Sequence, residues 1–167
     1  MEAKTQISVE EYLETSFDGP DCDYVDGEIV ERNVGENPHS KAQVNLVVAL
    51  HALGQKLFLH VRTELRMRVA PRRFRIADVA VFAGEEPAED VPSSPPLIAI
   101  EILSRKDQYA EIMAKFDDYR NWGVRHVWFV DPWLRRIHVY AAGSLQEVPA
   151  FQLPEYGVEI PASRIFE

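Results

Sequence analysis

The chain has 167 residues, 46% of them apolar, and a formal net charge of −9. This length fits a single domain with a sizeable core, and the lone cysteine, Cys22, excludes an internal disulfide and a zinc-ribbon spacing. No segment approaches the roughly 18 consecutive apolar residues of a membrane span, and residues 1–12 carry acids rather than the apolar run of a secretory signal. We therefore expect a soluble, cytoplasmic protein with one domain over residues 1–167.

The charge is polarised along the chain. Residues 1–36 hold eleven acids and two bases, whereas residues 37–75 hold eight bases and one acid, Glu64. Such a basic stretch could meet a phosphate backbone, or it could be a solvated strand face and loop. The eight bases are Lys41, Lys56, Arg62, Arg66, Arg68, Arg72, Arg73 and Arg75.

The first third of the chain contains local start and turn signals. Ser8 followed by Glu11 predicts a capping box that opens a short helix through about Ser16. Residues 22–31 predict two strands joined at Asp26-Gly27, a favoured type I′ turn. Pro38 is placed at a helix start, and the apolar residues of 39–59 recur at helical spacing.

The rest of the chain predicts a sheet with one further helix. Residues 61–69 alternate apolar and polar side chains, and residues 76–82 form a more apolar strand. A loop over 84–96 precedes the strand 97–103, which is apolar on both faces apart from Glu101. We then expect a helix over 106–122 that ends at Gly123, and strands over 125–131 and 135–141.

This order predicts an α/β fold with a mixed central sheet flanked by helices, preceded by a helix and a hairpin. The strands 97–103 and 125–130 are expected to form a parallel crossover unit, and the core is expected over about 22–141. The tail from about Leu145 is expected to be peripheral. Its Phe151, Ile160 and Phe166 are expected to be exposed and available for dimer contact.

Two acids in apolar strands are candidates for metal binding. Glu101 lies inside LIAIEIL and Asp78 inside IADVAVF, and a buried carboxylate is costly without a compensating cation. If the strands pair, the acids converge and repel each other unless a divalent cation lies between them. Oxygen ligands favour Mg²⁺ or Mn²⁺ over zinc. Alternatively, each acid pairs with a buried arginine or caps a helix.

An ordered set of residues resembles the Uma-two-type restriction endonucleases, a family of the PD-(D/E)XK nuclease superfamily. The resemblance covers about residues 7–140. It is carried by Asp26-Gly27-Glu28, His39, Arg75–Val81 with Asp78, Pro96–Ser104 with Glu101, Asp107, Lys115, Tyr119, Gly123-Val124 and Trp128–Pro132.

The resemblance implies a restriction-endonuclease-like fold and an endonuclease that hydrolyses phosphodiester bonds of DNA with Mg²⁺, with Mn²⁺ as an alternative ion. It implies that Asp78, Glu101 and the backbone carbonyl of Ile102 bind the metal. A lysine would orient the attacking water and stabilise the developing charge. Related nucleases pair into dimers, so a homodimer is also expected.

The chain departs from the family's motif at the lysine. The motif places this lysine two residues after Glu101, where the chain has Leu103. The resemblance points instead to Lys115 on the following helix, because a long side chain can reach the same point from there. The alternative is a solvent-facing Lys115 that pairs with Glu111.

Three further residues have two interpretations each. Glu28 could be a third catalytic carboxylate or a solvated acid beside the turn. His39 could bind a phosphate or an acid of the site, or simply start a helix. Asp107 could anchor Lys115 or cap its helix.

The missing motif lysine also leaves a second function open. The protein could be a catalytically inactive nuclease-fold module that binds nucleic acid or a partner protein. The distance of the Lys115 ammonium from Asp78 and Glu101 discriminates the two functions.

Overall fold

The computed structural model describes residues 6–167. Met1–Thr5, on which the expectation about a secretory signal partly rests, lie outside the described residues. Within residues 6–167, no helix is both long and apolar enough to cross a membrane.

The amino-terminal elements follow their local sequence signals. Helix α1 (Val9–Glu14) begins after Ser8, whose side chain accepts a hydrogen bond from the Glu11 amide at 3.1 Å. Strands β1 (Asp23–Val25) and β2 (Glu28–Val30) form the predicted hairpin. Its turn has φ values of 52° at Asp26 and 105° at Gly27, and a type I′ turn requires positive φ at both positions.

The central sheet is mostly antiparallel, with one parallel pair. Its strand order is β2-β1-β4-β5-β6-β7-β8, and β3 also pairs with β4. Strands β5 and β6 are parallel, which confirms the predicted parallel pair on either side of a helix. The remaining strands are β3 (Leu59–Ala70), β4 (Arg73–Ala83), β5 (Ile98–Ile102), β6 (His126–Asp131), β7 (Arg136–Ala141) and β8 (Ser144–Val148).

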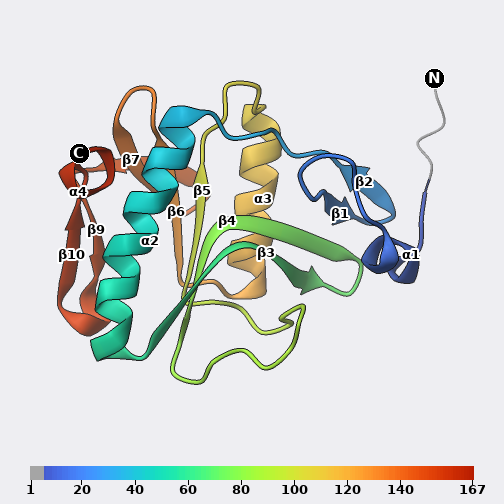
Figure 1. Ribbon diagram of the computed structural model, residues 1–167, viewed down its shortest axis with the longest axis horizontal. Coiled ribbons are helices and arrows are strands. Elements are labelled where there is room, and N and C mark those ends of the chain that lie inside the picture. Colours follow the sequence, from blue (N-terminus) through green and yellow to red (C-terminus); the bar gives the residue numbers. More distant parts are fainter. Residues whose placement is uncertain (1–5) are drawn as a thin grey trace.

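Two long helices lie on either side of this sheet (Figure 1). Helix α2 (Asn37–Leu57) packs Leu46 and Leu50 with Ile100 of β5 in one apolar cluster. Helix α3 (Tyr109–Trp122) packs Phe116 with Ala99 of β5 in another. Because strand side chains alternate between faces, Glu101 shares the α3 face with Ala99. The predicted mixed sheet flanked by helices is confirmed.

The carboxyl-terminal segment corrects the predicted tail. It forms β9 (Ala150–Leu153), a 3₁₀ turn (Pro154–Tyr156), β10 (Val158–Pro161) and α4 (Ser163–Phe166). The side chains of Phe151 and Ile160 are buried, with 0% and 3% exposure. Phe151 stacks on Trp128 with ring centroids 4.2 Å apart.

The prediction of a peripheral, exposed tail is therefore wrong, and so is the limit of the core at about residue 141. Within residues 6–167 the strands β9 and β10 pair only with each other. Each has four residues, which is too short to leave a long periodic pattern in the sequence. Their apolar side chains complete the cluster beneath α2. Phe151 and Ile160 are consequently not available for dimer contact.

Truncating Phe151 should test this assignment to the core. We expect Phe151→Ala to lower the free energy of unfolding by about 3–5 kcal/mol, because it leaves a cavity beneath a stacked ring. Phe58→Ala is the matched control, since Phe58 is 74% exposed and should change stability by only about 0.5 kcal/mol. Urea unfolding followed by circular dichroism measures both, and equal effects would contradict a core role for the tail.

Candidate functional site

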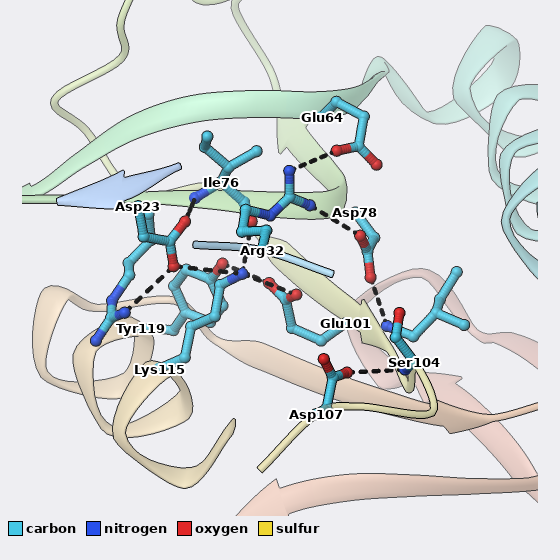
Figure 2. A network of polar contacts seen from close by, with 12 residues as sticks. Asp23, Arg32, Glu64, Ile76, Asp78, Glu101, Ser104, Asp107, Lys115 and Tyr119 are labelled. Atoms are coloured by element: carbon cyan, nitrogen blue, oxygen red, sulfur yellow. Dashed lines mark hydrogen bonds and ion pairs between the residues drawn. The ribbon is translucent and has the colours of Figure 1, made fainter. Parts of the chain in front are cut away.

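The three central residues of the predicted site meet in one pocket (Figure 2). Val79 of β4 pairs with Ile100 of β5, so Asp78 and Glu101 lie one position further on in the same antiparallel register. Both acids, Lys115 and Ile102 line a pocket of about 80 Å³. A space of that size admits several water molecules, each needing about 10–15 Å³.

Lys115 points into the pocket rather than to solvent. Its Nζ donates hydrogen bonds to Glu101 Oε2 at 2.9 Å and to the Ile76 carbonyl at 2.7 Å. Only 11% of its side chain is exposed. The solvent-facing alternative with Glu111 as partner is therefore wrong. Helix α3 places the Lys115 ammonium beside the Glu101 carboxylate, a contact that the apolar side chain of Leu103 cannot make.

Glu101 is held by two donors. Tyr119 of α3 donates from its hydroxyl to Glu101 Oε1 at 2.6 Å, while Lys115 contacts Oε2. Burial raises the pKa of Glu101 to about 7, although the positive charge of Lys115 opposes that rise. Both carboxylate oxygens therefore have fixed directions, which favours a preorganised site.

Asp78 is surrounded by positive charge. Arg32 Nη2 donates to Oδ1 at 3.1 Å, His39 Nε2 lies 3.3 Å from Oδ2, and the Ile102 amide donates to Oδ2 at 2.7 Å. Burial opposes ionisation of Asp78, but the hydrogen bond and charge of His39, with Lys115 and Arg32, hold its pKa below the usual value. His39 thus contacts an acid of the site, which agrees with the first of its two interpretations.

Asp78 also pairs with a largely buried arginine, Arg32. This pairing is what the alternative to metal binding predicted. Arg32 was not singled out from the sequence, because it lies between two elements and no local pattern marks it. Its partners Glu64 and Asp78 are 32 and 46 residues further along the chain.

Asp23 is the third buried carboxylate near the site, and the sequence did not single it out. Its Oδ1 accepts a hydrogen bond from the Ile76 amide at 2.9 Å, and its Oδ2 lies 3.2 Å from Arg75 Nη1 and 3.7 Å from Lys115 Nζ. Arg75 also binds Asp118 of α3. This network positions Lys115 from the side opposite Glu101. Its only sequence signal is an acid at the start of a short strand.

Of two other predicted residues, Asp107 lines the same pocket and Glu28 does not. Glu28 begins β2 and is not among the residues that line the pocket, and its catalytic role stays a prediction. Asp107 accepts hydrogen bonds from the Ser104 amide at 2.8 Å and from Asn33 Nδ2 at 2.6 Å. Asp107 therefore closes the β5–α3 turn and neither contacts Lys115 nor caps α3, whose N-cap residue is Gln108.

The basic stretch 37–75 does not form one free basic surface. Arg75 is buried on Asp23 and Asp118, and Arg73 binds Asp26 and Asp118. Arg62 pairs with Glu86 and Arg66 with Asp21. Half of its eight bases are thus paired within the chain, which fits neither a continuous phosphate surface nor a wholly solvated face.

The donor set of the pocket fits a hard divalent cation. Residues 6–167 contain no cluster of three or more His, Cys, Asp or Glu side chains arranged to hold a metal. Asp78 and Glu101 nevertheless place carboxylate oxygens at one pocket, which Ile102 also lines. Mg²⁺ commonly binds through one or two carboxylates and keeps water and substrate phosphate as its other ligands. The residues present are therefore compatible with Mg²⁺ or Mn²⁺.

The fold and this buried carboxylate–lysine site define a nuclease-like α/β protein. The model of the Uma2 family, described as "Putative restriction endonuclease", matches residues 9–164. The chain therefore belongs to that family, and with it to a family of nucleases.

A solved structure has the same fold. It is the crystal structure described as "a putative nuclease belonging to DUF820 from Anabaena variabilis ATCC 29413". The two chains are 19% identical, the TM-score is 0.83, and the match covers 96% of this chain and 97% of the other. No curated protein sequence matches the chain.

The raised pKa of Glu101 predicts a pH-dependent stability in EDTA. Because the folded protein holds this proton up to about pH 7, against an ordinary pKa of 4.5, the stabilisation is present below pH 4.5 and is lost as the pH rises through 7. Relative to Glu101→Gln, the wild type should therefore lose roughly 1–3 kcal/mol of unfolding free energy across that window. Urea unfolding of both proteins at about pH 5 and about pH 8 measures this, and a constant difference would contradict it.

Proposed function

We propose that the protein is a metal-dependent endonuclease that hydrolyses phosphodiester bonds of DNA. In this proposal Asp78, Glu101 and the carbonyl of Ile102 hold Mg²⁺ or Mn²⁺, and Lys115 serves as the catalytic lysine. The observation that carries the proposal is the 2.9 Å contact between Lys115 Nζ and Glu101 Oε2. This contact supports Lys115 of α3 as the counterpart of the strand lysine in the family's motif.

The chemistry is divided between the cation and the chain. When bound, a divalent cation supplies Lewis acidity at the phosphate and lowers the pKa of a bound water. Lys115 would donate a hydrogen bond to the attacking water and stabilise the negative charge of the pentavalent phosphorane. Tyr119 would hold Glu101 Oε1 in place, so that Glu101 keeps a fixed orientation during the reaction.

Two further parts of the proposal rest on the family. Its description as a restriction endonuclease family supports DNA as the substrate and internal cleavage as the reaction. A two-fold homodimer would present one site to each strand. Sedimentation equilibrium of the purified protein, alone and with a duplex oligonucleotide, tests the oligomeric state separately from the chemistry.

Cleavage of supercoiled plasmid tests the proposed reaction. We expect nicking in Mg²⁺ or Mn²⁺, none in EDTA, and a loss of at least about 10³-fold in Asp78→Asn and Glu101→Gln, because each variant removes a charged ligand. Asp21→Asn is the control for loss of an acid, since the Asp21 side chain is 55% exposed and lies 3.7 Å from Arg66. Cleavage that persists in EDTA, or is equal in all variants, would contradict the proposal.

One observation favours the second candidate, an inactive nuclease-fold module that binds nucleic acid or a partner protein. Both oxygens of Asp78 already have protein partners, namely Arg32, His39 and the Ile102 amide. A module of this kind would retard duplex DNA in a gel at low salt but would not cleave it, whichever metal ion is added.

A further inference from the structure

Arg32 lines the pocket and bridges two acids. Its Nη1 donates to Glu64 Oε2 at 2.7 Å, and its Nη2 donates to Asp78 Oδ1 at 3.1 Å (Figure 2). The Arg32 side chain is 12% exposed and Glu64 is 49% exposed. One end of the guanidinium therefore faces a buried acid of the proposed metal site, while the other end faces a carboxylate near the surface.

Glu64 has an unusual backbone conformation that keeps it at this position. It lies in β3 between Thr63 and Leu65, which pair with Val79 and Ala77 of β4, and so it lies across from Asp78. Its φ is 50°, a left-handed value that costs a non-glycine residue on the order of 1 kcal/mol or more. Gln43 of α2 donates to Glu64 Oε1 at 2.9 Å. Glu64 thus has a strained backbone and accepts hydrogen bonds from both Arg32 and Gln43. Such an acid is suited to hold Arg32 in place beside the site.

Arg32 and a divalent cation would compete for the same carboxylate oxygen, Asp78 Oδ1. A bound Mg²⁺ sits about 2.1 Å from each ligand oxygen. A guanidinium nitrogen 3.1 Å from Asp78 Oδ1 would then lie within a few ångströms of the metal, and two cations at that distance repel each other strongly. Binding of the metal through this oxygen therefore weakens its contact with Arg32 Nη2 and favours departure of that nitrogen. The bond from Nη1 to Glu64 is not in conflict with the metal.

We propose that Arg32 is an exchangeable counter-ion that becomes a ligand of the scissile phosphate. Without metal it neutralises Asp78. When a divalent cation binds, the guanidinium stays anchored on Glu64 through Nη1 and turns Nη2 toward the pocket, which Arg32 lines. The planar fork of arginine suits a phosphate oxygen there. This inference rests on the proposed metal-dependent cleavage and adds a residue that contacts the substrate.

Direct measurement of Mn²⁺ binding by electron paramagnetic resonance tests the exchange. Arg32→Met should bind Mn²⁺ on the order of tenfold more tightly than the wild type, because a competing charge is gone. Glu64→Gln should bind Mn²⁺ severalfold more weakly, because Arg32 then loses its salt bridge to Glu64 and keeps the one to Asp78. Arg125→Met is the control, since the Arg125 side chain is 68% exposed and its guanidinium lies 3.8 Å from Glu155.

Plasmid cleavage at saturating Mn²⁺ tests the phosphate contact. Arg32→Met should cleave slower by on the order of 10²-fold despite its tighter metal binding, because the phosphate loses a charged donor. Its melting temperature should also be lower than that of the wild type in EDTA and should recover when Mn²⁺ is added. If Arg32→Met does not fold, Arg32→Lys keeps the charge but loses the fork, and it should retain Mn²⁺ binding while cleaving more slowly.

The outcomes separate this inference from the proposed function. A wild type that binds no Mn²⁺ would overturn both. A wild type that binds Mn²⁺ and cleaves DNA, with equal or weaker Mn²⁺ binding in Arg32→Met, would overturn the exchange alone. Unchanged cleavage by Arg32→Met and Arg32→Lys at saturating Mn²⁺ would overturn the phosphate contact.

Discussion

Replacing Lys115 by methionine should lower the single-turnover rate of plasmid cleavage by about 10²–10³-fold at saturating Mg²⁺. Methionine keeps much of the apolar stem but removes the ammonium that contacts Glu101 Oε2 and the Ile76 carbonyl. The attacking water then loses its charged donor. Metal binding should persist, because Asp78 and Glu101 remain.

The rate and the metal affinity must be measured on the same preparations. Lys56→Met is the matched control, because Lys56 is an exposed lysine at the end of α2, and it should cleave at the wild-type rate. A Lys115→Met protein that cleaves as fast as the wild type would remove Lys115 from the mechanism while leaving the two carboxylates in place.

Asp23→Asn should give the largest loss of stability among substitutions that preserve side-chain size. The amide oxygen can still accept from the Ile76 amide, but Arg75 and Lys115 lose a buried negative partner. Breaking a buried ion pair by neutralising one member costs about 3–5 kcal/mol. The lower end applies here, because Arg75 keeps Asp118 and Lys115 keeps Glu101.

Chemical unfolding of Asp23→Asn and of Asp21→Asn compares the loss of a buried negative charge with the loss of an exposed one. Asp21 is an exposed acid two residues earlier, and its neutralisation should change the unfolding free energy by about 1 kcal/mol or less. If Asp23→Asn were no more destabilising than Asp21→Asn, the network behind Lys115 would contribute little to the fold.

Local signals made much of the fold predictable. Ser8 and Glu11, the Asp26-Gly27 turn and Gly123 each mark an element boundary through backbone chemistry that acts within a few residues. The apolar run around Glu101 marked a central strand, because a strand covered on both faces reads as a near-continuous apolar run. The tail was misjudged, because β9 and β10 are too short to show a period and their burial depends on α2.

The site was predictable where an acid interrupts an apolar strand, as at Asp78 and Glu101. It was not predictable where the chemistry depends on contacts between distant segments. Arg32 lies outside any helix or strand, and Asp23 joins Arg75 across 52 residues. The position of Lys115 came from the family resemblance, and nothing in the local pattern of α3 distinguishes it from a surface lysine.

The most direct test of the relocated lysine returns it to the strand. Leu103 follows the last residue of β5 and comes two residues after Glu101, and it packs against the cluster that contains Phe116 of α3. We expect the double variant Leu103→Lys/Lys115→Met to cleave plasmid faster than Lys115→Met alone, because it restores an ammonium beside Glu101 at the motif position. A double variant that folds and binds Mn²⁺ like the wild type, yet cleaves no faster than Lys115→Met, would contradict the claim that the site needs a lysine at that point.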